Sequence, residues 1–386
     1  KTNEDGTLVP IIQAAPVYLQ HYSEDTCPQC ADYTGDKGYK LDDVKRGIVS
    51  MDEFLAQLSD LDLCHIVKGE GMSSPKVTPG TAAAFGGLTP NLTYFGIPAG
   101  CCTDGPSGLR MDCGTNAFSL PGGTLLACTF NTSLNADLFE MEGIEMRNNH
   151  IESLLGPGMN IHRCPLNGRN FEYYSEDSVL AGYIGASSIA GAQSYGVYAY
   201  MKHFALNDQQ INQNEMLCTW ADEQAIREIY LRPFEISAKV GGCKAVMSSW
   251  NYIGNQWAGA CNALLNGVLR GEWGFRGMVI TDGFHFTDYM DSDIAIRNGC
   301  DLMLKNYDVA TNHLTDTTSA TSVKAMRQAC KNIMYTVVNS RVYDPANTVS
   351  TPIWRTAMIV VDVLLAVLLV VLEVLTFKSY KKKKAQ

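Results

Sequence analysis

The chain has 386 residues, 46% of them hydrophobic, and a formal net charge of −10. This length accommodates one large α/β barrel or two ordinary domains. Because part of the basic charge is clustered at the carboxyl terminus, the rest of the chain is more acidic still. It offers no basic stripe to phosphates, which argues against a nucleic-acid partner and suits neutral ligands such as sugars.

The first forty residues (1–40) are rich in Pro, Gly and Asp and are predicted to be a linker or arm. The chain starts at Lys1 without Met, so we expect that an upstream domain precedes this arm. Cys27-Pro-Gln-Cys30 would suit a redox pair or half of a zinc site, but no second CxxC or HxxxH follows it. We therefore expect neither a metal ion nor an organic cofactor.

A helix is predicted to start at Ser50-Met-Asp-Glu53, which has the form of a capping box ahead of apolar residues at helical spacing. The Gly- and Pro-rich loop that follows, Gly69 to Gly87, is too long for a simple connector. Loops of that length often shape a site in a compact enzyme.

Beyond this loop, short apolar runs that end in polar residues alternate with amphipathic stretches. The runs are Ile97–Cys102, Leu125–Phe130, Leu154–Met159, Val197–Met201, Ala245–Met247, Met278–Ile280 and Leu302–Leu304. The helical patterns are Asn135–Asn149, Ser178–Tyr195, Ala221–Val240, Ala263–Glu272 and Ser322–Asn339. This alternation predicts βαβ units and a parallel sheet. Seven strands, with an eighth hidden in the early loops, favour an α/β fold with a (β/α)8 TIM-type barrel over residues 41–345. A doubly wound sheet is the alternative, but no GxGxxG follows any strand.

The carboxyl-terminal segment is strongly apolar over residues 353–377, and a basic tail, 378–386, follows it. Its Val, Leu and Ile residues each gain about 0.3–0.6 kcal/mol on insertion, against a penalty of roughly 3 for a central Asp. Asp362 and Glu373 therefore weaken the prediction of a transmembrane helix without overturning it; a long soluble helix is the alternative. Lysines after the span predict a cytoplasmic tail and a single-pass cell-membrane protein with its body on the outer face.

Asp282 follows the buried run Met278–Ile280, and Gly283 then lets the backbone turn away. A carboxylate at the end of a buried strand is expensive to desolvate, so it requires partners or a function. In a barrel, such strand ends converge on the face that carries the active site. We therefore predict that Asp282 is a nucleophile.

Other polar residues are predicted to reach the same face. Asp104 lies in a turn sequence that ends at Arg110, and Lys202-His203 ends another apolar run. The segment Leu166–Asp177 places Arg169 and Glu172 among aromatic residues, which suits carbohydrate. Trp250 follows a strand end and is interpreted either as a stacking platform or as core.

The reaction type follows partly by elimination. No GxSxG, HExxH or P-loop pattern is present, which disfavours acyl transfer, metalloprotease and kinase chemistry. A carboxylate nucleophile ringed by donors for a polyol fits glycoside hydrolysis through a covalent glycosyl-enzyme intermediate. That chemistry requires a second carboxyl group about 5–5.5 Å away. Glu172, Asp104 and Asp288 are the candidates within the chain.

Five motifs together resemble the barrel domain of glycoside hydrolase family 3, the β-glucosidase-type enzymes. In chain order they are Gly156–Arg163, Asn167–Asp177, Lys202–Asp208, Val246–Asn251 and Met278–Asp282. The resemblance implies that Asp282 is the nucleophile and that Asp104, Arg169, Lys202 and His203 hold the hydroxyls of a terminal β-linked sugar.

The chain also departs from the family. Many relatives have Trp after the nucleophile, where this chain has Gly283-Phe284, so the leaving-group subsite is expected to be more open or shaped by Phe284. Lys202-His203-Phe204 does not continue as the KHFPGHG loop of the β-N-acetylhexosaminidase branch. The family's acid/base is usually a glutamate on an α/β sandwich domain downstream of the barrel. The chain instead resembles a membrane-anchored, reversed-order subgroup, which implies that an upstream sandwich domain of the same gene product supplies that residue.

The competing hypothesis is a membrane-anchored carbohydrate-binding module that keeps the pocket without turnover. The missing acid/base and Gly283 favour it, whereas the intact set of Asp282, Lys202, His203 and Arg169 disfavours it. Since a binding module has no need of a nucleophile at a strand end, we favour the enzyme.

Overall fold

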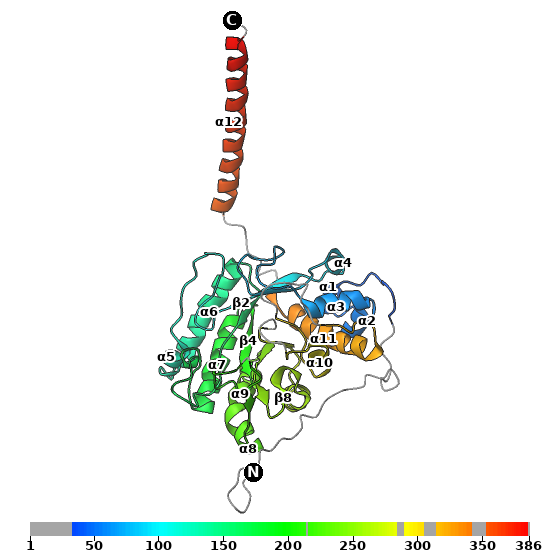
Figure 1. Cartoon of the computed structure of the whole chain (residues 1–386), viewed down its shortest axis with the longest axis vertical. Coiled ribbons are helices and arrows are strands. Elements are labelled where there is room, and N and C mark those ends of the chain that lie inside the picture. Colours follow the sequence, from blue (N-terminus) through cyan, green and yellow to red (C-terminus); the bar gives the residue numbers. More distant parts are fainter. Residues whose placement is uncertain (1–32, 214, 284–288, 305–313, 342–352, 385–386) are drawn as a thin grey trace, which may run out of the picture. The chain divides into compact units, whose positions relative to one another are not determined.

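The computed structural model describes residues 33–213, 215–283, 289–304, 314–341 and 353–384, which divide into a folded body and a separate carboxyl-terminal unit that begins at Thr348 (Figure 1). The helices of the body are α1 (Leu41–Lys45), α2 (Met51–Ala56), α3 (Asp60–Lys68), α4 (Pro90–Tyr94), α5 (Gly123–Ala127), α6 (Thr132–Asn148), η2 (Asn170–Glu172), α7 (Ser178–Gln193), α8 (Glu223–Ala225), η3 (Ile226–Tyr230), α9 (Arg232–Lys239), η4 (Ala258–Ala260), η5 (Ala263–Glu272), α10 (Ser292–Arg297) and α11 (Ala320–Val338). Its strands are β1 (Ala83–Gly86), β2 (Ala99–Asp104), β3 (Ser153–Leu155), β4 (Tyr198–Phe204), β5 (Cys218–Thr219), β6 (Ala245–Ser248), β7 (Tyr252–Ile253), β8 (Gln256–Trp257) and β9 (Met278–Ile280).

The body is built on a six-stranded sheet with the order β1-β2-β3-β4-β6-β9 among the described residues. From β2 to β9 every neighbouring pair is parallel, and a further parallel bridge joins Ile280 to Leu302. Within this sheet, as far as the structure describes it, only β1 and β2 pair antiparallel. The carboxyl ends of the parallel strands therefore lie along one edge of the sheet.

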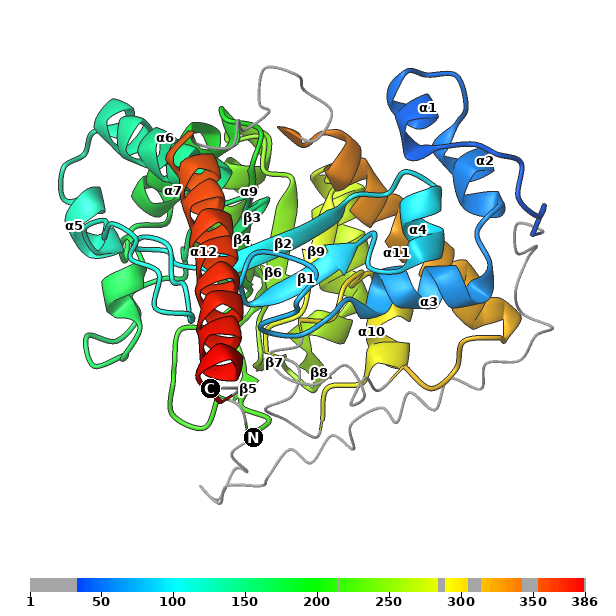
Figure 2. The same cartoon turned by 90° about the horizontal axis from the view of Figure 1, so that it is seen from above.

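Helices flank this sheet, with α6, α7 and α9 at one end of the view in Figure 2 and α3, α10 and α11 at the other. Helix α7 packs against α6, α9 and β4, α9 also contacts β4, and α11 packs against β9, α3 and α10. The strands β2, β3, β4, β6 and β9 are almost wholly buried, as apolar runs in the interior of an α/β domain are expected to be. A small second sheet, β5-β7-β8, follows the ends of β4 and β6 along the chain.

The α/β barrel-like architecture is confirmed, with a sheet that accounts for half a barrel. The predicted runs that end at residues 102, 159, 201, 247 and 280 coincide with β2, β3, β4, β6 and β9, and the strand expected in the early loops is β1. Closure into a complete (β/α)8 barrel stays a prediction. The capping box at Ser50 is confirmed: Ser50 Oγ accepts from the backbone N–H of Glu53, whose carboxylate accepts from the Ser50 N–H.

Two sequence predictions are wrong. The run Leu125–Phe130 is not a strand, because Gly123–Ala127 forms helix α5 and buries Leu126 and Ala127 while Leu125 and Phe130 face solvent. The sheet is also not parallel throughout, because β1 turns back onto β2. Gly87 allows this close return, since a side chain there would collide with the main chain of Ile97.

The carboxyl-terminal unit contains the single helix α12 (Ile353–Lys384), which extends beyond the predicted span of 353–377. By length and composition, its residues Ala357–Lys381 are apolar enough to cross a membrane. The apolar side chains described in this stretch are exposed.

Candidate active site

Asp282 lies two residues beyond β9, where the parallel strands end. Its neighbours across the sheet come from the ends of β2 (Asp104), of β4 (Lys202 and His203) and of β6 (Trp250). Arg169 and Glu172 come from the loop after β3, in and beside the short helix η2. The sheet therefore brings together residues that are as much as 178 positions apart in the chain, from 104 to 282.

All seven predicted site residues line a single cavity of about 620 Å³. The cavity contains the carboxylates of Asp104, Glu172 and Asp282, the cations of Arg169 and Lys202, and the rings of His203 and Trp250. Its outer wall is formed by Met72, Pro106, Arg110, Phe171, Gln210 and Gln213. A volume of this size is in the range of pockets that hold small molecules.

The two carboxylate oxygens of Asp282 differ in their hydrogen bonding. Its Oδ1 accepts from the backbone N–H of Gly283 at 2.7 Å. Its Oδ2 is 3.7 Å from Nε2 of His203 and has no hydrogen-bond partner among the described residues. Burial raises the pKa of Asp282, and the nearby charges of Arg169 and Lys202 offset part of that rise.

The charged residues around Asp282 form two linked pairs. Lys202 Nζ contacts Asp104 Oδ1 at 2.7 Å and lies 4.0 Å from Glu172 Oε2, while Arg169 Nε binds the other oxygen of Glu172. Burial alone would raise the pKa of Asp104, but Lys202 and Arg169 outweigh it and hold this pKa below its ordinary value. Asp104 and Glu172 are therefore bound to cations, which disfavours both as the acid that protonates a leaving group.

His203 is buried between two polar partners. Asn160 holds its main chain, with Nδ2 donating to the His203 carbonyl at 2.9 Å and Oδ1 accepting from its N–H at 2.8 Å. The ring nitrogen Nδ1 lies 3.1 Å from the Tyr173 hydroxyl. Burial, together with Arg169 and Lys202, lowers the pKa of His203 well below its usual range, so the imidazole is neutral.

Trp250 was expected to be either a stacking platform or part of the core. It lines the cavity and packs, partly buried, against the core. Its carbonyl accepts from the Tyr289 hydroxyl at 2.7 Å and so ties the loop after β6 to the segment before α10. Phe284, predicted to shape the leaving-group subsite, and Asp288, a candidate acid, lie outside the described residues.

Sequence reasoning missed the residues that surround His203. The sequence gives Tyr173 only as an aromatic residue of its loop and gives Asn160 and Asn207 no role of their own. All three lie inside motifs named above, Gly156–Arg163, Asn167–Asp177 and Lys202–Asp208, and this is the signal that could have found them.

Residues 36–342, which make up most of the chain, match the glycosyl hydrolase family 3 N terminal domain. The chain belongs to this family. It is 54% identical over 250 residues to a β-glucosidase of Ruminococcus albus and 38% identical over 257 residues to β-glucosidase A of Butyrivibrio fibrisolvens, in each case over 65% of this chain.

Two solved β-glucosidase structures have a similar fold. A β-glucosidase from Paenibacillus barengoltzii superimposes with a TM-score of 0.77 and 40% identity over 91% of this chain. β-glucosidase 3B from Thermotoga neapolitana in complex with α-D-glucose gives a TM-score of 0.69 and 32% identity over 79% of this chain. The match covers 26% and 30% of the two curated relatives and 40% and 44% of the two solved chains, so this family 3 chain spans less than half the length of each.

Proposed function

We propose that this chain is the nucleophile-bearing part of a retaining, β-glucosidase-like hydrolase that releases terminal β-linked sugars. The observation that carries the proposal is that Asp282 lines a sugar-sized cavity, with an Oδ2 that has no hydrogen-bond partner among the described residues and lies beside His203. A carboxylate that retains one unbonded oxygen can attack an anomeric carbon without first breaking a hydrogen bond on that oxygen.

In this mechanism Asp282 attacks the anomeric carbon and forms a covalent glycosyl-enzyme intermediate, which water then hydrolyses. Asp104, Lys202, Arg169 and His203 would bind the hydroxyls of the sugar, because their charge-assisted hydrogen bonds suit a polyol. Trp250 and Glu172 would complete the wall of the same subsite. The acid/base would come from outside this chain, from the α/β sandwich domain of a membrane-anchored, reversed-order gene product. The ion pairs of Asp104 and Glu172 and the greater length of the relatives support this assignment.

The remaining parts of the proposal concern the domains and their location. We propose that residues 1–40 form an arm, 41–345 the barrel, 353–377 a transmembrane helix and 378–386 a cytoplasmic tail, which places the barrel on the outer face of the membrane. The exposed apolar surface of α12 supports this arrangement.

A mechanism-based probe tests the central claim. A 2-fluoro-β-glucoside with an activated leaving group needs little protonation, so it should label this chain even without the acid/base. We expect one covalent adduct on the peptide that carries Asp282, detected by mass spectrometry, and none with Asp282→Asn. In the full-length gene product the same substitution should lower kcat by several orders of magnitude. Binding of the sugar with no adduct at Asp282 would favour the carbohydrate-binding module instead.

A further inference from the structure

The environment of His203 fixes where its proton lies. The side chain is buried, with Nδ1 3.1 Å from the Tyr173 hydroxyl and Nε2 3.7 Å from Oδ2 of Asp282. A neutral imidazole carries one hydrogen, on one nitrogen or the other, and its partners decide which.

On the Nδ1 side, Tyr173 is itself held by a third residue. Nδ2 of Asn207 lies 3.2 Å from the Tyr173 oxygen, and an amide nitrogen can only donate. The phenol oxygen therefore accepts from Asn207, and its own hydrogen is directed to Nδ1 of His203. Burial raises the pKa of Tyr173, so the phenol keeps that hydrogen.

On the Nε2 side, the neighbour is a carboxylate oxygen, 3.7 Å away, that has no hydrogen-bond partner among the described residues. A carboxylate only accepts, so an imidazole lone pair directed at it would be repelled and an N–H attracted. The two sides of the ring independently require the same arrangement.

We infer that Tyr173, oriented by Asn207, is a positioning residue that holds His203 as the tautomer with hydrogen on Nε2. The imidazole then presents a fixed N–H to the cavity, beside the nucleophile. On the proposed function, on which this consequence rests, His203 donates to a sugar hydroxyl next to the reacting carbon and does not act as an acid or a base.

Nitrogen-15 spectra of the histidine-labelled chain test the tautomer without any turnover. The His203 signals are identified by their loss in His203→Gln. We expect Nε2 to resonate as a protonated nitrogen and Nδ1 as an unprotonated, hydrogen-bonded one. Tyr173→Phe should shift the Nδ1 signal toward that of an unprotonated nitrogen without a hydrogen bond. It should also allow the tautomer with hydrogen on Nδ1 to appear.

Tyr174→Phe is the matched control. Tyr174 is the adjacent residue and is equally buried, but its hydroxyl bonds Ser188 at 2.6 Å and does not reach His203. Removal of the Tyr174 hydroxyl should leave the chemical shifts of His203 unchanged. A wild-type spectrum with hydrogen on Nδ1 would overturn the inference, because Asn207 would then present its oxygen to Tyr173. No change in Tyr173→Phe would also overturn it.

A second variant, Asn207→Asp, tests the inference if Tyr173→Phe fails to fold. Its carboxylate accepts the phenol hydrogen, so the Tyr173 oxygen becomes an acceptor toward His203, which should switch to the tautomer with hydrogen on Nδ1. If the folded variant keeps the hydrogen on Nε2, Tyr173 and Asn207 do not set the tautomer.

Labelling kinetics give the functional readout. We expect Tyr173→Phe to slow covalent labelling of Asp282 by about tenfold to a hundredfold, as the loss of an orienting outer partner does at other histidines. Tyr174→Phe should label at the wild-type rate. If the wild type is not labelled, the hydrolase proposal fails while the spectra still decide the tautomer.

Discussion

Asp282 is buried enough for its pKa to be raised, yet it must be ionised to act as a nucleophile. Covalent labelling by the 2-fluoro-glucoside should therefore fall as the pH drops through this raised pKa. Arg169 is the strongest of the nearby charges that lower the pKa of Asp282. Replacing Arg169 with Met should move the acid limb of the labelling rate upward by about one pH unit, because the loss of a cation disfavours the carboxylate.

The control is Arg232→Met, which removes an exposed arginine that pairs with Glu235 on α9. This variant should keep the wild-type acid limb. An acid limb that stays in place or moves downward in Arg169→Met would show that the cation does not govern ionisation of the nucleophile.

Asp208 is a buried carboxyl that the proposed mechanism does not use. Burial raises its pKa from 3.8 to about 7, although Oδ1 accepts from the Ile161 N–H at 3.0 Å. The folded state thus keeps its proton to higher pH than the unfolded chain does. The stability linked to Asp208 is fully present below about pH 4 and is lost as the pH rises to about 7.

Asp208→Asn should abolish the loss of stability that accompanies ionisation of Asp208 as the pH rises. We expect the variant to gain free energy of unfolding relative to the wild type as the pH rises from 4 to 8, by an amount on the order of a few kcal/mol. Urea unfolding of the detergent-solubilised chain measures this difference. Asp137→Asn, on the exposed side of α6, is the control and should track the wild type. A constant difference between Asp208→Asn and the wild type over this range would contradict the shifted pKa.

At the scale of residues, the sequence identified seven of the side chains that line the cavity, because each follows an apolar run or lies in a charged loop beside one. It did not identify Tyr173, Asn207 or Asp208 as site partners. Their importance depends on which atoms meet after folding: Tyr173 and Asn207 lie 34 residues apart and meet only because β4 runs beside the segment that follows β3.

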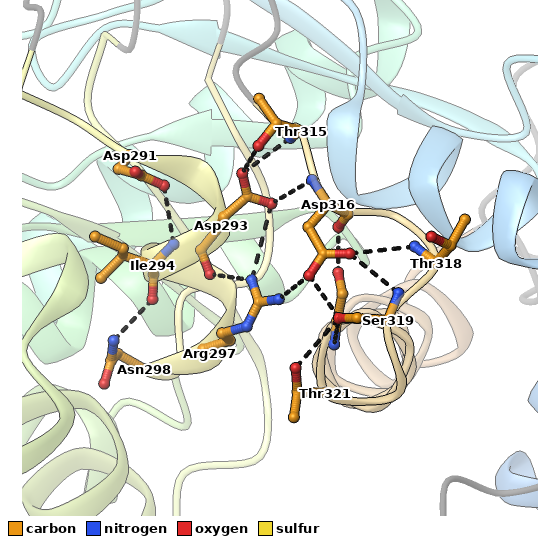
Figure 3. A network of polar contacts seen from close by, with 11 residues as sticks. Asp291, Asp293, Ile294, Arg297, Asn298, Thr315, Asp316, Thr318, Ser319 and Thr321 are labelled. Carbon is orange, nitrogen blue, oxygen red and sulfur yellow. Dashed lines mark hydrogen bonds and ion pairs between the residues drawn. The ribbon is translucent and has the colours of Figure 1, made fainter. Parts of the chain in front are cut away.

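At the scale of elements, a polar network joins α10 to the start of α11 (Figure 3). The Asp293 carboxylate accepts from the N–H and hydroxyl of Thr315 at 2.9 and 2.7 Å and from the N–H of Asp316 at 3.1 Å. Arg297 pairs with Asp316 at 2.6 Å and lies 3.8 Å from Asp293. The network thus holds the chain as it enters α11.

Asp293→Ala should destabilise the body by about 2–4 kcal/mol, because it leaves backbone donors and a buried guanidinium short of an acceptor. Asp291→Ala is the comparison. Asp291 caps the same helix by accepting one hydrogen bond from the Ile294 N–H, and its loss should lower the free energy of unfolding by only about 1 kcal/mol. Urea unfolding of both variants measures the difference. Equal effects would mean that the network adds nothing beyond an ordinary cap.

The sequence predicted correctly the strands that are buried on both faces, and it mispredicted a stretch that is buried on one side only. The strands β2, β4, β6 and β9 are buried on both faces, so their apolar runs are continuous and easily recognised. The stretch around α5 is short and buries only one side, and in such a run strand and helix patterns are hard to distinguish. The region Ala221–Val240 was predicted as one helix, but the structure divides it into α8, η3 and α9, with Pro233 in the first turn of α9.

At the scale of the whole molecule, the proposed topology places the body outside the cell and the lysines of α12 inside. Cysteine thiols in the body can be used to test this topology. All eleven cysteines among the described residues are free, and Cys113, Cys128, Cys164 and Cys218 are exposed. The segment 353–386 contains no cysteine, so labelling of thiols reports on the remainder of the chain alone.

A membrane-impermeant maleimide applied to intact cells should therefore label the wild-type chain, with little further labelling after permeabilisation. Replacing the lysines at 381–384 with Gln removes the charges that retain the tail in the cytoplasm, so a larger share of the chains should insert in the opposite orientation and become labelled only after permeabilisation. Replacing Lys324 and Lys331 of α11 with Gln removes lysines outside the flank of the span and should leave the labelling of intact cells unchanged. Recovery of the wild-type chain in the soluble fraction would contradict the anchor. Labelling only after permeabilisation would place the body, and with it the sugar site, on the cytoplasmic side.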